Sequence, residues 1–236
     1  MAVPGLAGYT PPLRGEVRGA ISYKRMNETP NPATRSATAR DLMAAARRLF
    51  ATHGFEGSSV REITAAAGAN LGAITYHFGS KAELYNRVVA ECVEPMADSV
   101  VAAANAPARV LERVALVVRA YFEQISRDED TGRVMLQAVA IGSRTPEAAT
   151  QGIRRIHATL LALVAEGQAN GVIRDGDPRL LSLSIVSVPL HLALVRRALK
   201  ANAGVDLDDP AQREAAIQHA IRFVTEALAS HAGRNT

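Results

Sequence analysis

The sequence predicts an all-α fold in which a small three-helix head, built on a helix-turn-helix, precedes a larger helical body, with about nine helices in all. From Ser36 onward apolar residues recur at three- and four-residue spacing, which is the period of an amphipathic helix. No run of alternating β-branched residues bounded by hairpin turns occurs. Capping residues and glycines mark the helix ends, and they indicate a head over residues 36–95 and a body over residues 96–236.

The composition excludes several classes of protein. With 236 residues, of which 48% are hydrophobic, most of the chain cannot be disordered or fibrous. The single cysteine, Cys92, permits neither an internal disulfide nor a thiolate metal cage, which favours a reducing cytoplasm. The apolar stretch over residues 180–195 is shorter than the ~20 residues of a spanning helix, and the N-terminus lacks the pattern of a secretory signal. We therefore expect a cytoplasmic protein without a membrane span.

The positive charge of the chain is concentrated at its N-terminus. Residues 1–40 hold six basic and two acidic residues, which accounts for the whole formal net charge of +4. Five prolines and the lack of helical periodicity predict that residues 1–35 form a disordered basic extension. This extension is either a solvated tail or a basic arm that meets a polyanion, and Met26 within it is an alternative translation start.

The first two helices of the head have clear end signals. The first helix is expected over residues 38–53, with Gly54 as its left-handed stop. Ser59 and Glu62 have the spacing of a capping box for the second helix, which ends at Gly68.

Similar signals bound the next two helices. The third helix is expected to begin after Asn70, a good N-cap, and to end near Phe78. A second capping box, formed by Ser80 and Glu83, opens the fourth helix, which Pro95 kinks or ends.

Three helix starts in the body share a cap residue followed directly by proline. These pairs are Thr145-Pro146, Asp177-Pro178 and Asp209-Pro210. Together with apolar segments over residues 109–126 and 133–142, they predict about five further helices.

The segment over residues 59–81 carries the pattern that is most specific for a function. A tight turn over residues 68–70 joins two short helices that stack on a third, which is the helix-turn-helix arrangement. We expect four apolar side chains to pack inward: Ile63, Ala67, Ile74 and Phe78. The rest of the third helix is then left for solvent or a partner: Leu71, Gly72, Ala73, Thr75, Tyr76 and His77.

A short helix exposed in this way fits the major groove of DNA, which is about 12 Å wide and admits one α-helix. Thr75 and Tyr76 can reach base edges or phosphates, and Arg61 can reach a phosphate or a guanine edge. The N-termini of the second and fourth helices offer free amide groups to phosphates, and Lys81 adds a full charge there.

From about Ser36 to Val93 the sequence resembles the DNA-binding domain of the TetR family of transcriptional regulators. The resemblance is carried by ARDLMAAARRLFATHGFEGSSVREITAAAGANLGAITYHFGSKAELY, and most specifically by the block AGANLGAITYHFGSKAELY. Asn70-Leu71 followed by ITYHFGSK is most similar to the CecR-type branch of the family. The resemblance implies a DNA-binding head followed by a helical body that binds an effector and dimerises.

The resemblance also implies a role for each matching position. Residues implied to contact DNA phosphates are Ser59, Tyr76, His77 and Lys81. Residues implied to face the bases are Arg61, Leu71, Gly72, Ala73 and Thr75. Because residues 71–73 offer no side-chain hydrogen bond, specificity should depend on Arg61, Thr75, methyl contacts and DNA shape. Alternatively, Tyr76 and His77 pack within the head, and Lys81 is a solvated residue of a first helical turn.

For the body, the resemblance implies a dimer and a small-molecule pocket. The last two helices, over residues 178–200 and 210–232, are implied to form the dimer seam through Leu190, Leu194, Ile217, Phe223, Val224 and Leu228. These residues fit the core of a monomer equally well.

Larger side chains that could line an effector cavity are Tyr121, Phe122, Met135, His157 and His191. A lone histidine on an apolar face is, however, more often a core residue. The histidines lack metal-ligand spacing, so neither a metal nor another cofactor is expected.

We therefore expect a homodimeric transcriptional repressor that binds double-stranded operator DNA and is released by a small-molecule effector. The alternative is a helical interaction protein, or a family member that does not bind DNA, because the charges of residues 41–236 balance. The chain lacks a phosphate loop, a nucleophile elbow and a metalloprotease signature, so an enzyme is not expected.

Overall fold

The computed structural model of the chain describes residues 32–140 and 147–230. The chain forms two units, residues 1–37 and 38–236, and of the first unit only the start of the first helix is described. Of the stretch predicted to be disordered, residues 1–35, the first 31 lie outside the described residues, as does the predicted Thr145-Pro146 helix start. Residues 32–35 belong to the first helix, so the prediction is wrong for them.

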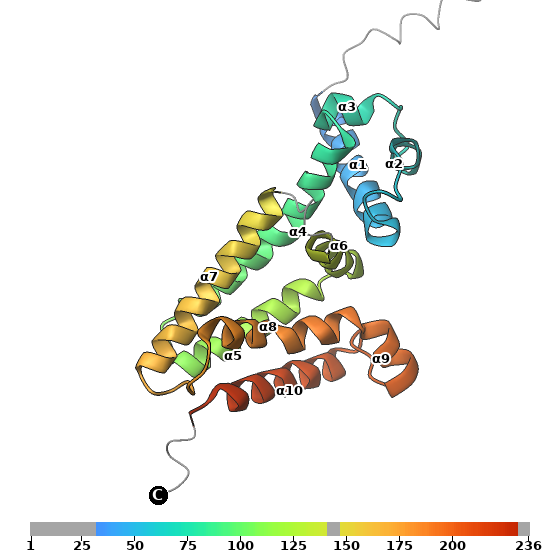
Figure 1. The fold of residues 1–236 in the computed structure, drawn as a ribbon. Helices are drawn as coiled ribbons and strands as arrows, with labels where there is room; N and C mark the ends of the chain where they lie inside the picture. Colours follow the sequence, from blue (N-terminus) through green and yellow to red (C-terminus); the bar gives the residue numbers. More distant parts are fainter. Residues whose placement is uncertain (1–31, 141–146, 231–236) are drawn as a thin grey trace, which may run out of the picture. The chain divides into compact units, whose positions relative to one another are not determined.

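The described residues form ten helices and no strand, which confirms the all-α prediction (Figure 1). The helices are α1 (Pro32–His53), α2 (Val60–Ala66), α3 (Ala73–Phe78), α4 (Lys81–Ala104), α5 (Val110–Ile125), α6 (Glu129–Ala140), α7 (Glu147–Ala169), α8 (Pro178–Leu194), α9 (Arg196–Ala203) and α10 (Pro210–Leu228).

The head comprises α1 from Thr38 onward, α2, α3 and the first turns of α4. Its core consists of apolar side chains that the sequence places on the inner faces of these helices: Leu42, Ala45, Ala46, Phe50, Ile63, Ile74, Leu84 and Val88. Phe50 and Tyr85 meet edge to face with ring centroids 5.0 Å apart, and Phe55 lies 5.1 Å from Tyr85. This aromatic cluster fixes the loop between α1 and α2 against α4.

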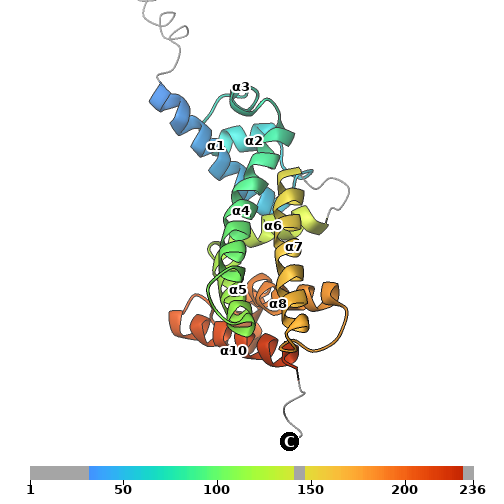
Figure 2. The same cartoon turned by 90° about the vertical axis from the view of Figure 1, so that its left-hand side faces the viewer.

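Helix α4 runs without interruption from Lys81 to Ala104, across residues 95 and 96, where the sequence predicts the division between head and body. Pro95 lies inside the helix, so the prediction that it could end the helix is wrong. In both views α4 lies beside α7 (Figures 1 and 2). A Cβ atom on Gly152 of α7 would come within 2.2 Å of Val93 of α4, so only glycine permits this approach. The division between head and body falls within one helix, and its boundaries stay a prediction.

The body consists of α5 to α10 with the remainder of α4. Helix α8 packs mainly against α5, α7 and α10 (Figure 2). The predicted caps open the last two long helices, because the Asp177 carboxylate accepts from Arg179 N and the Asp209 carboxylate accepts from Gln212 N. The aspartate-proline signals are therefore confirmed at both positions.

The predicted helix over residues 178–200 is two helices, α8 and α9, bent by 64° with respect to each other. The break at Val195 follows from burial, since α8 contributes several core side chains and no residue of α9 is buried. At the other end of α9 the chain turns at Gly204, whose φ is 67°, and Lys200 forms an ion pair with Asp206 across this turn at 2.7 Å. Within the described residues no single helix is long and apolar enough to cross a membrane, although the bent pair α8 and α9 would be if taken together.

Three helix starts differ from the predictions. Helix α1 begins at Pro32, before the expected residue 38, and α6 begins at Glu129, before the expected residue 133. Helix α3 begins at Ala73, because residues 70–73 first form a turn in which Ala73 N donates to Asn70 O. Gly72 is the N-cap, so the prediction that Asn70 caps α3 is wrong.

Candidate nucleic-acid interface

The turn between α2 and α3 is fixed by backbone hydrogen bonds and one left-handed residue. Gly68 has φ of 62°, a conformation that favours glycine over any residue with a Cβ atom. Ala69 N donates to Thr64 O at 2.9 Å, which closes the end of α2. Ile63 and Ile74 are fully buried on the facing sides of the two helices. The helix-turn-helix predicted over residues 59–81 is therefore present in the fold.

Most of the outer surface of α3 and the turn before it is available to a partner. Leu71 and Tyr76 are 63% and 62% exposed, which is high for side chains of this size, and Gly72 and Thr75 are exposed as well. Ala73 is only 6% exposed and belongs to the hydrophobic core. The prediction that Ala73 faces solvent is wrong, because the buried stripe of α3 is wider than the pair Ile74 and Phe78 suggests.

His77 is half-buried between its aromatic neighbours. Its ring meets Tyr76 edge to face at 4.9 Å between centroids and lies 6.2 Å from Phe78. The packing alternative therefore holds in part for His77, whereas Tyr76 projects its large ring into solvent.

Lys81 is bound within the protein, unlike the solvated first-turn residue of the alternative prediction. Its Nζ donates to the carbonyl oxygens of Phe55 and Ser58, both at 2.7 Å. The same ammonium group lies 4.2 Å from the centroid of the Phe55 ring, which adds a cation–π contact. Lys81 thus ties the N-terminus of α4 to the loop that leads into α2.

The N-terminus of α2 is closed by a full capping box. Ser59 Oγ accepts from Glu62 N at 3.1 Å, while Ser59 N donates to the Glu62 carboxylate at 2.8 Å. Ser59 Oγ also donates to Glu62 Oε2 at 2.7 Å, so the hydroxyl implied to bind phosphate is already bonded. Hydrogen bonds from the Ser59 side chain and backbone lower the pKa of Glu62, which keeps this carboxylate ionised.

Donors nevertheless remain at both helix N-termini. The amide groups of residues 60 and 61 in α2, and of residues 81 and 82 in α4, have no acceptor within their own helix. The Arg61 side chain is exposed and forms no ion pair with the described residues. These donors and α3 belong to the same compact unit, residues 38–236. The contact of Phe55 with Tyr85, which no sequence pattern indicates, holds the loop before α2 against α4.

The structure does not gather the five residues predicted to line an effector cavity. Tyr121 and Phe122 of α5 and Met135 of α6 are buried in the body. Burial raises the pKa of Tyr121 to about 12, so this phenol is neutral at physiological pH. His157 of α7 and His191 of α8 are exposed, and they share no interior cavity with the other three.

Three depressions in the described surface are lined by other residues. The first lies between α1, α4 and α6 and has a volume of about 350 Å³, with Arg47, Glu91, Cys92, Gln124 and Asp128 in its wall. The second, of about 340 Å³, lies between α4, α5 and α7 and contains Asn105, Arg113 and Glu166. A smaller one lies beside Arg133 and Arg197. Among the described residues, no group of three or more His, Cys, Asp or Glu side chains could hold a metal ion.

The predicted seam of the last helices lies partly in the core. Ile217, Val224 and Leu228 are buried within the protein, so they fill the monomer as the alternative prediction has it. Leu190 and Leu194 are half-buried, whereas Phe223 is 56% exposed. Leu180 and Leu183 of α8 are also exposed, at 64% and 43%.

Comparison with known domain families gives two matches along the chain. Residues 42–88 match the family of bacterial regulatory proteins described as tetR. Residues 111–224 match a family described as the tetracyclin repressor-like C-terminal domain. The two matches follow each other in the order of head and body.

Curated relatives match over parts of their length. The HTH-type transcriptional repressor AcnR of Corynebacterium efficiens is 41% identical over 61 residues, which is 26% of this chain and 32% of that protein. The HTH-type transcriptional activator FasR of Mycolicibacterium smegmatis is 29% identical over 124 residues, or 52% of this chain and 55% of that protein. The match thus spans about a third of the AcnR relative and about half of FasR.

Solved structures match over most of the chain. A regulatory protein of the tetR family from Rhodococcus RHA1 has a TM-score of 0.68 at 18% identity, covering 82% of this chain and 97% of its own. The fatty acid degradation regulator FadR from Bacillus halodurans has a TM-score of 0.61 at 19% identity, covering 84% and 97%. These likenesses show the fold, while the narrower CecR-type resemblance stays a prediction. With both domain families matched in order and this fold, the chain belongs to the TetR family of transcriptional regulators.

Proposed function

We propose that this protein is a cytoplasmic, homodimeric repressor that binds operator DNA through α3 and the N-termini of α2 and α4. The observation that carries the proposal is the exposed surface around α3, where Leu71 and Tyr76 project beside Thr75 from a rigid, well-packed head. Both side chains are large and mostly exposed on a head whose other large apolar side chains are packed, as expected of a surface that meets a partner. A partner surface that accepts them is the major groove of DNA.

The proposed contacts follow the geometry of the head. Leu71, Gly72 and Thr75 face the bases, because they are exposed at the start of α3. Tyr76 and His77 contact phosphate on one side of the groove, and the amide groups that open α2 and α4 do so on the other. Arg61 reaches a phosphate or a guanine edge from the first turn of α2. Ala73 supports α3 from the core and has no direct part.

Ser59 and Lys81 assist phosphate binding in a more restricted way than the sequence implies. The Ser59 hydroxyl stays in its capping box, where it orders the amide groups at the start of α2. Lys81 has used two of its three N–H donors on backbone carbonyls, which leaves one for a phosphate. Both residues therefore act mainly by positioning the backbone amide groups at the N-termini of α2 and α4 for phosphate.

A homodimer is proposed because one short helix reads only a few base pairs. Two copies give useful specificity when they bind the two halves of a pseudopalindromic site. The exposed side chains of α8 and α10, Leu180, Leu183 and Phe223, support an isologous seam between these helices of two subunits. Half-buried Leu190 and Leu194 complete the proposed surface.

Release by a small-molecule effector is proposed for the helical body. Tyr121, Phe122 and Met135 provide larger side chains among small aliphatic ones, and a ligand that entered between α5 and α6 would displace them. His157 and His191 are left out of this proposal because they are exposed. Repression is the proposed direction of control, in line with the AcnR relatives, although FasR is an activator.

Footprinting of the full-length protein on the promoter beside its own coding region tests the DNA-binding proposal. We expect a protected site with two similar half-sites, and a Tyr76→Ala variant that loses the protection while it stays folded. If the wild-type protein protects no site there and binds every duplex with the same weak affinity, the alternative of a helical interaction protein is favoured.

A further inference from the structure

The turn before α3 carries an exposed asparagine that caps no helix. The N-cap of α3 is Gly72, and Asn70, the residue expected in that role, has an exposed side chain. Within the described residues, the one hydrogen bond that involves Asn70 runs from Ala73 N to its backbone oxygen, at 3.0 Å. The carboxamide therefore has its two N–H donors and its oxygen acceptor available to a partner.

The carboxamide of Asn70 lies over the start of α3. A Cβ atom on Gly72 would have one neighbour within 4 Å outside the adjoining residues, and this neighbour is Asn70 Oδ1 at 3.7 Å. Gly72 has φ of −78°, a value that any residue can adopt, so the backbone does not require glycine here. The lack of a side chain at Gly72 leaves the space beside the Asn70 carboxamide open to a partner.

The exposed residues that follow Asn70 do not offer the same chemistry. Leu71 and Gly72 have no donor or acceptor in a side chain, and Thr75 has a single hydroxyl oxygen. The carboxamide of Asn70 instead holds a donor and an acceptor on two separate atoms of one planar group. This arrangement matches adenine, which presents an acceptor, N7, beside a donor, the N6 amino group, in the major groove.

We infer that Asn70 reads an adenine in each half-site of the operator. Its Nδ2 donates to adenine N7, and its Oδ1 accepts from the adenine N6 amino group. Guanine is rejected at this position, because it presents acceptors at both N7 and O6 and Oδ1 would face O6. The inference rests on the proposed DNA binding by α3, and it adds a residue to the base-facing set that the resemblance implies.

A contact with a phosphate is the alternative use of this side chain. Phosphate oxygens only accept hydrogen bonds, so such a contact would involve Nδ2 alone and would carry no base preference. The position of Oδ1 over Gly72, where the proposed reading helix begins, favours the base edge. The two uses predict different results when the carboxamide is removed, namely loss of one base preference or equal weakening on every sequence.

Binding-site selection with the full-length protein and its Asn70→Ala variant tests the inference. We expect the wild type to select an adenine at one fixed position of each half-site, and Asn70→Ala to lose the preference at that position alone. The variant should fold like the wild type, because the side chain that it loses makes no hydrogen bond within the described part of the chain. Asn70→Asp, whose carboxylate only accepts, should move the preference from adenine to cytosine, whose N4 amino group donates.

A modified base tests the same contact from the side of the DNA. A duplex with 7-deazaadenine at the selected position lacks the N7 acceptor and keeps the base pair. The wild type should bind this duplex at least about fivefold more weakly than the unmodified one, the lower end of what a bidentate contact contributes. Asn70→Ala should bind both duplexes equally.

Asn105→Ala is a matched control for the loss of a carboxamide. Asn105 is also exposed, but it lies at the opposite end of α4 from α3, and its Nδ2 donates to Val101 O at 2.8 Å. This variant should select the same half-site as the wild type and respond to 7-deazaadenine in the same way.

Three results would overturn the assignment of Asn70. The first is an Asn70→Ala variant that selects the same half-site as the wild type, or that changes the preference at a position other than an adenine. The second is a variant that weakens binding equally on every sequence, and the third is a wild type that binds the 7-deazaadenine duplex unchanged. A folded wild type that selects no sequence refutes the proposed function itself, so the two failures are distinguished.

Discussion

At the scale of single residues, the ammonium group of Lys81 joins two helix N-termini. It donates to the carbonyl oxygens of Phe55 and Ser58 and lies over the Phe55 ring. These contacts hold the N-terminus of α4 against the loop that leads into α2. Lys81→Met keeps the aliphatic stem and removes the hydrogen bonds. We expect a loss of about 1–3 kcal/mol in the free energy of unfolding, since hydrogen bonds to a charged donor are involved. Urea unfolding measures it, and Arg87→Met, an exposed cation on the same helix, should change stability by much less.

Thr75 is an exposed residue of α3 whose hydroxyl can bond a base edge. Thr75→Ala should therefore alter the preferred DNA sequence at one position of each half-site, by about 1–3 kcal/mol of discrimination. Binding-site selection with both proteins measures the change. Thr52→Ala, which removes an exposed hydroxyl of α1 away from the reading surface, should leave the profile unchanged. If Thr75→Ala and the wild type select the same DNA sequences, Thr75 does not contact a base edge.

The sequence predicts most of the exposed surface of α3 correctly, and its errors there have a physical cause. Ile74 and Phe78 define an inner face at four-residue spacing, but the buried stripe of a helix is broader than one such pair. Ala73 and half-buried His77 lie on the edge of that stripe. The internal contacts of Lys81 could not be predicted, because they depend on carbonyl groups of a loop more than twenty residues away.

At the scale of helices, Asp177 caps α8 with a carboxylate whose contribution to stability depends on pH. Hydrogen bonds from the Arg179 side chain and backbone lower the pKa of Asp177 to about 2, below its ordinary 3.8. Because the pKa is lowered in the folded protein, the ionised carboxylate stabilises the fold at pH values above the ordinary pKa of 3.8. This contribution disappears as the pH falls towards about 2. The stability difference between wild type and Asp177→Asn should thus be constant near neutral pH and shrink below about pH 4. Urea midpoints across this range measure it, and a difference that grows on acidification would contradict the assignment.

The contact between α4 and α7 depends on the absence of a side chain at Gly152. A Cβ atom there would lie 2.2 Å from Val93 Cγ1, so Gly152→Ala forces the two helices apart. We expect a loss of about 1–3 kcal/mol despite the better helix propensity of alanine, as for other overpacked cores. Thermal unfolding measures it. Val93→Ala should restore part of the stability in the double variant, and an additive loss would show that the contact is not the cause.

Helix ends with a side-chain signal were predictable, and those without one were not. The starts of α2, α8 and α10 follow from Ser59, Asp177 and Asp209, which cap through their own side chains. The break between α8 and α9 has no such signal, because Val195 is an ordinary helix residue in isolation. It arises where the buried face of α8 ends, since no residue of α9 is buried.

At the scale of the whole molecule, the outer faces of α8 and α10 carry the surface proposed for the dimer seam. Leu183 and Phe223 are exposed on neighbouring helices, so a charge at both positions should oppose the proposed seam. The Leu183→Glu/Phe223→Glu variant is expected to sediment as a monomer at micromolar concentration, where the wild type is a dimer. Val172→Glu, at a similarly exposed apolar position outside both helices, should remain dimeric. A wild type that is itself monomeric in the presence of DNA would refute the dimer.

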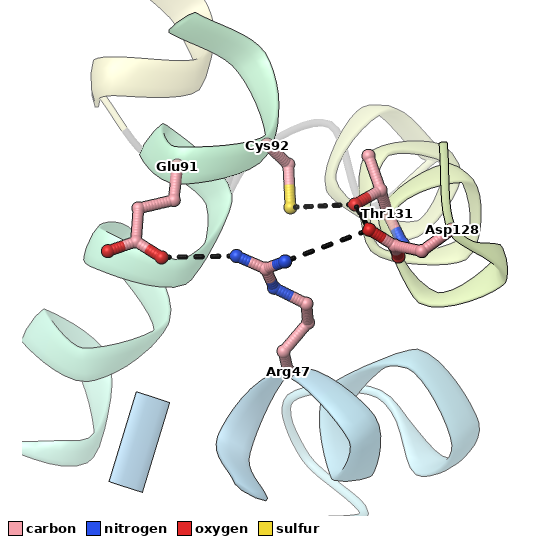
Figure 3. Close-up of polar contacts among 5 residues, drawn as sticks. All are labelled: Arg47, Glu91, Cys92, Asp128 and Thr131. Atoms are coloured by element: carbon pink, nitrogen blue, oxygen red, sulfur yellow. Dashed lines mark hydrogen bonds and ion pairs between the residues drawn. The ribbon is translucent and has the colours of Figure 1, made fainter. Parts of the chain in front are cut away.

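The overall charge of the chain gives DNA binding little support beyond the N-terminal extension. All of the +4 surplus belongs to residues 1–40, and the remainder of the sequence balances. In the proposed complex, affinity is therefore expected to depend on where Arg61, the helix N-termini and the exposed residues of α3 lie. The balance of charge could be predicted from the sequence alone. The polar contacts between α1 and the α6 region, such as the ion pair of Arg47 with Asp128 (Figure 3), could not, because they join residues that are distant in sequence.

Selection of bound duplexes from a random DNA pool with the full-length protein tests the central claim most directly. We expect enrichment of a pseudopalindrome whose half-sites are separated by about one helical turn of DNA, or ~10 base pairs, since two heads read successive major grooves. The Tyr76→Ala variant should fail to enrich this pseudopalindrome. A pool that stays random after repeated selection by folded wild-type protein would contradict the assignment of α3 as a DNA-reading helix.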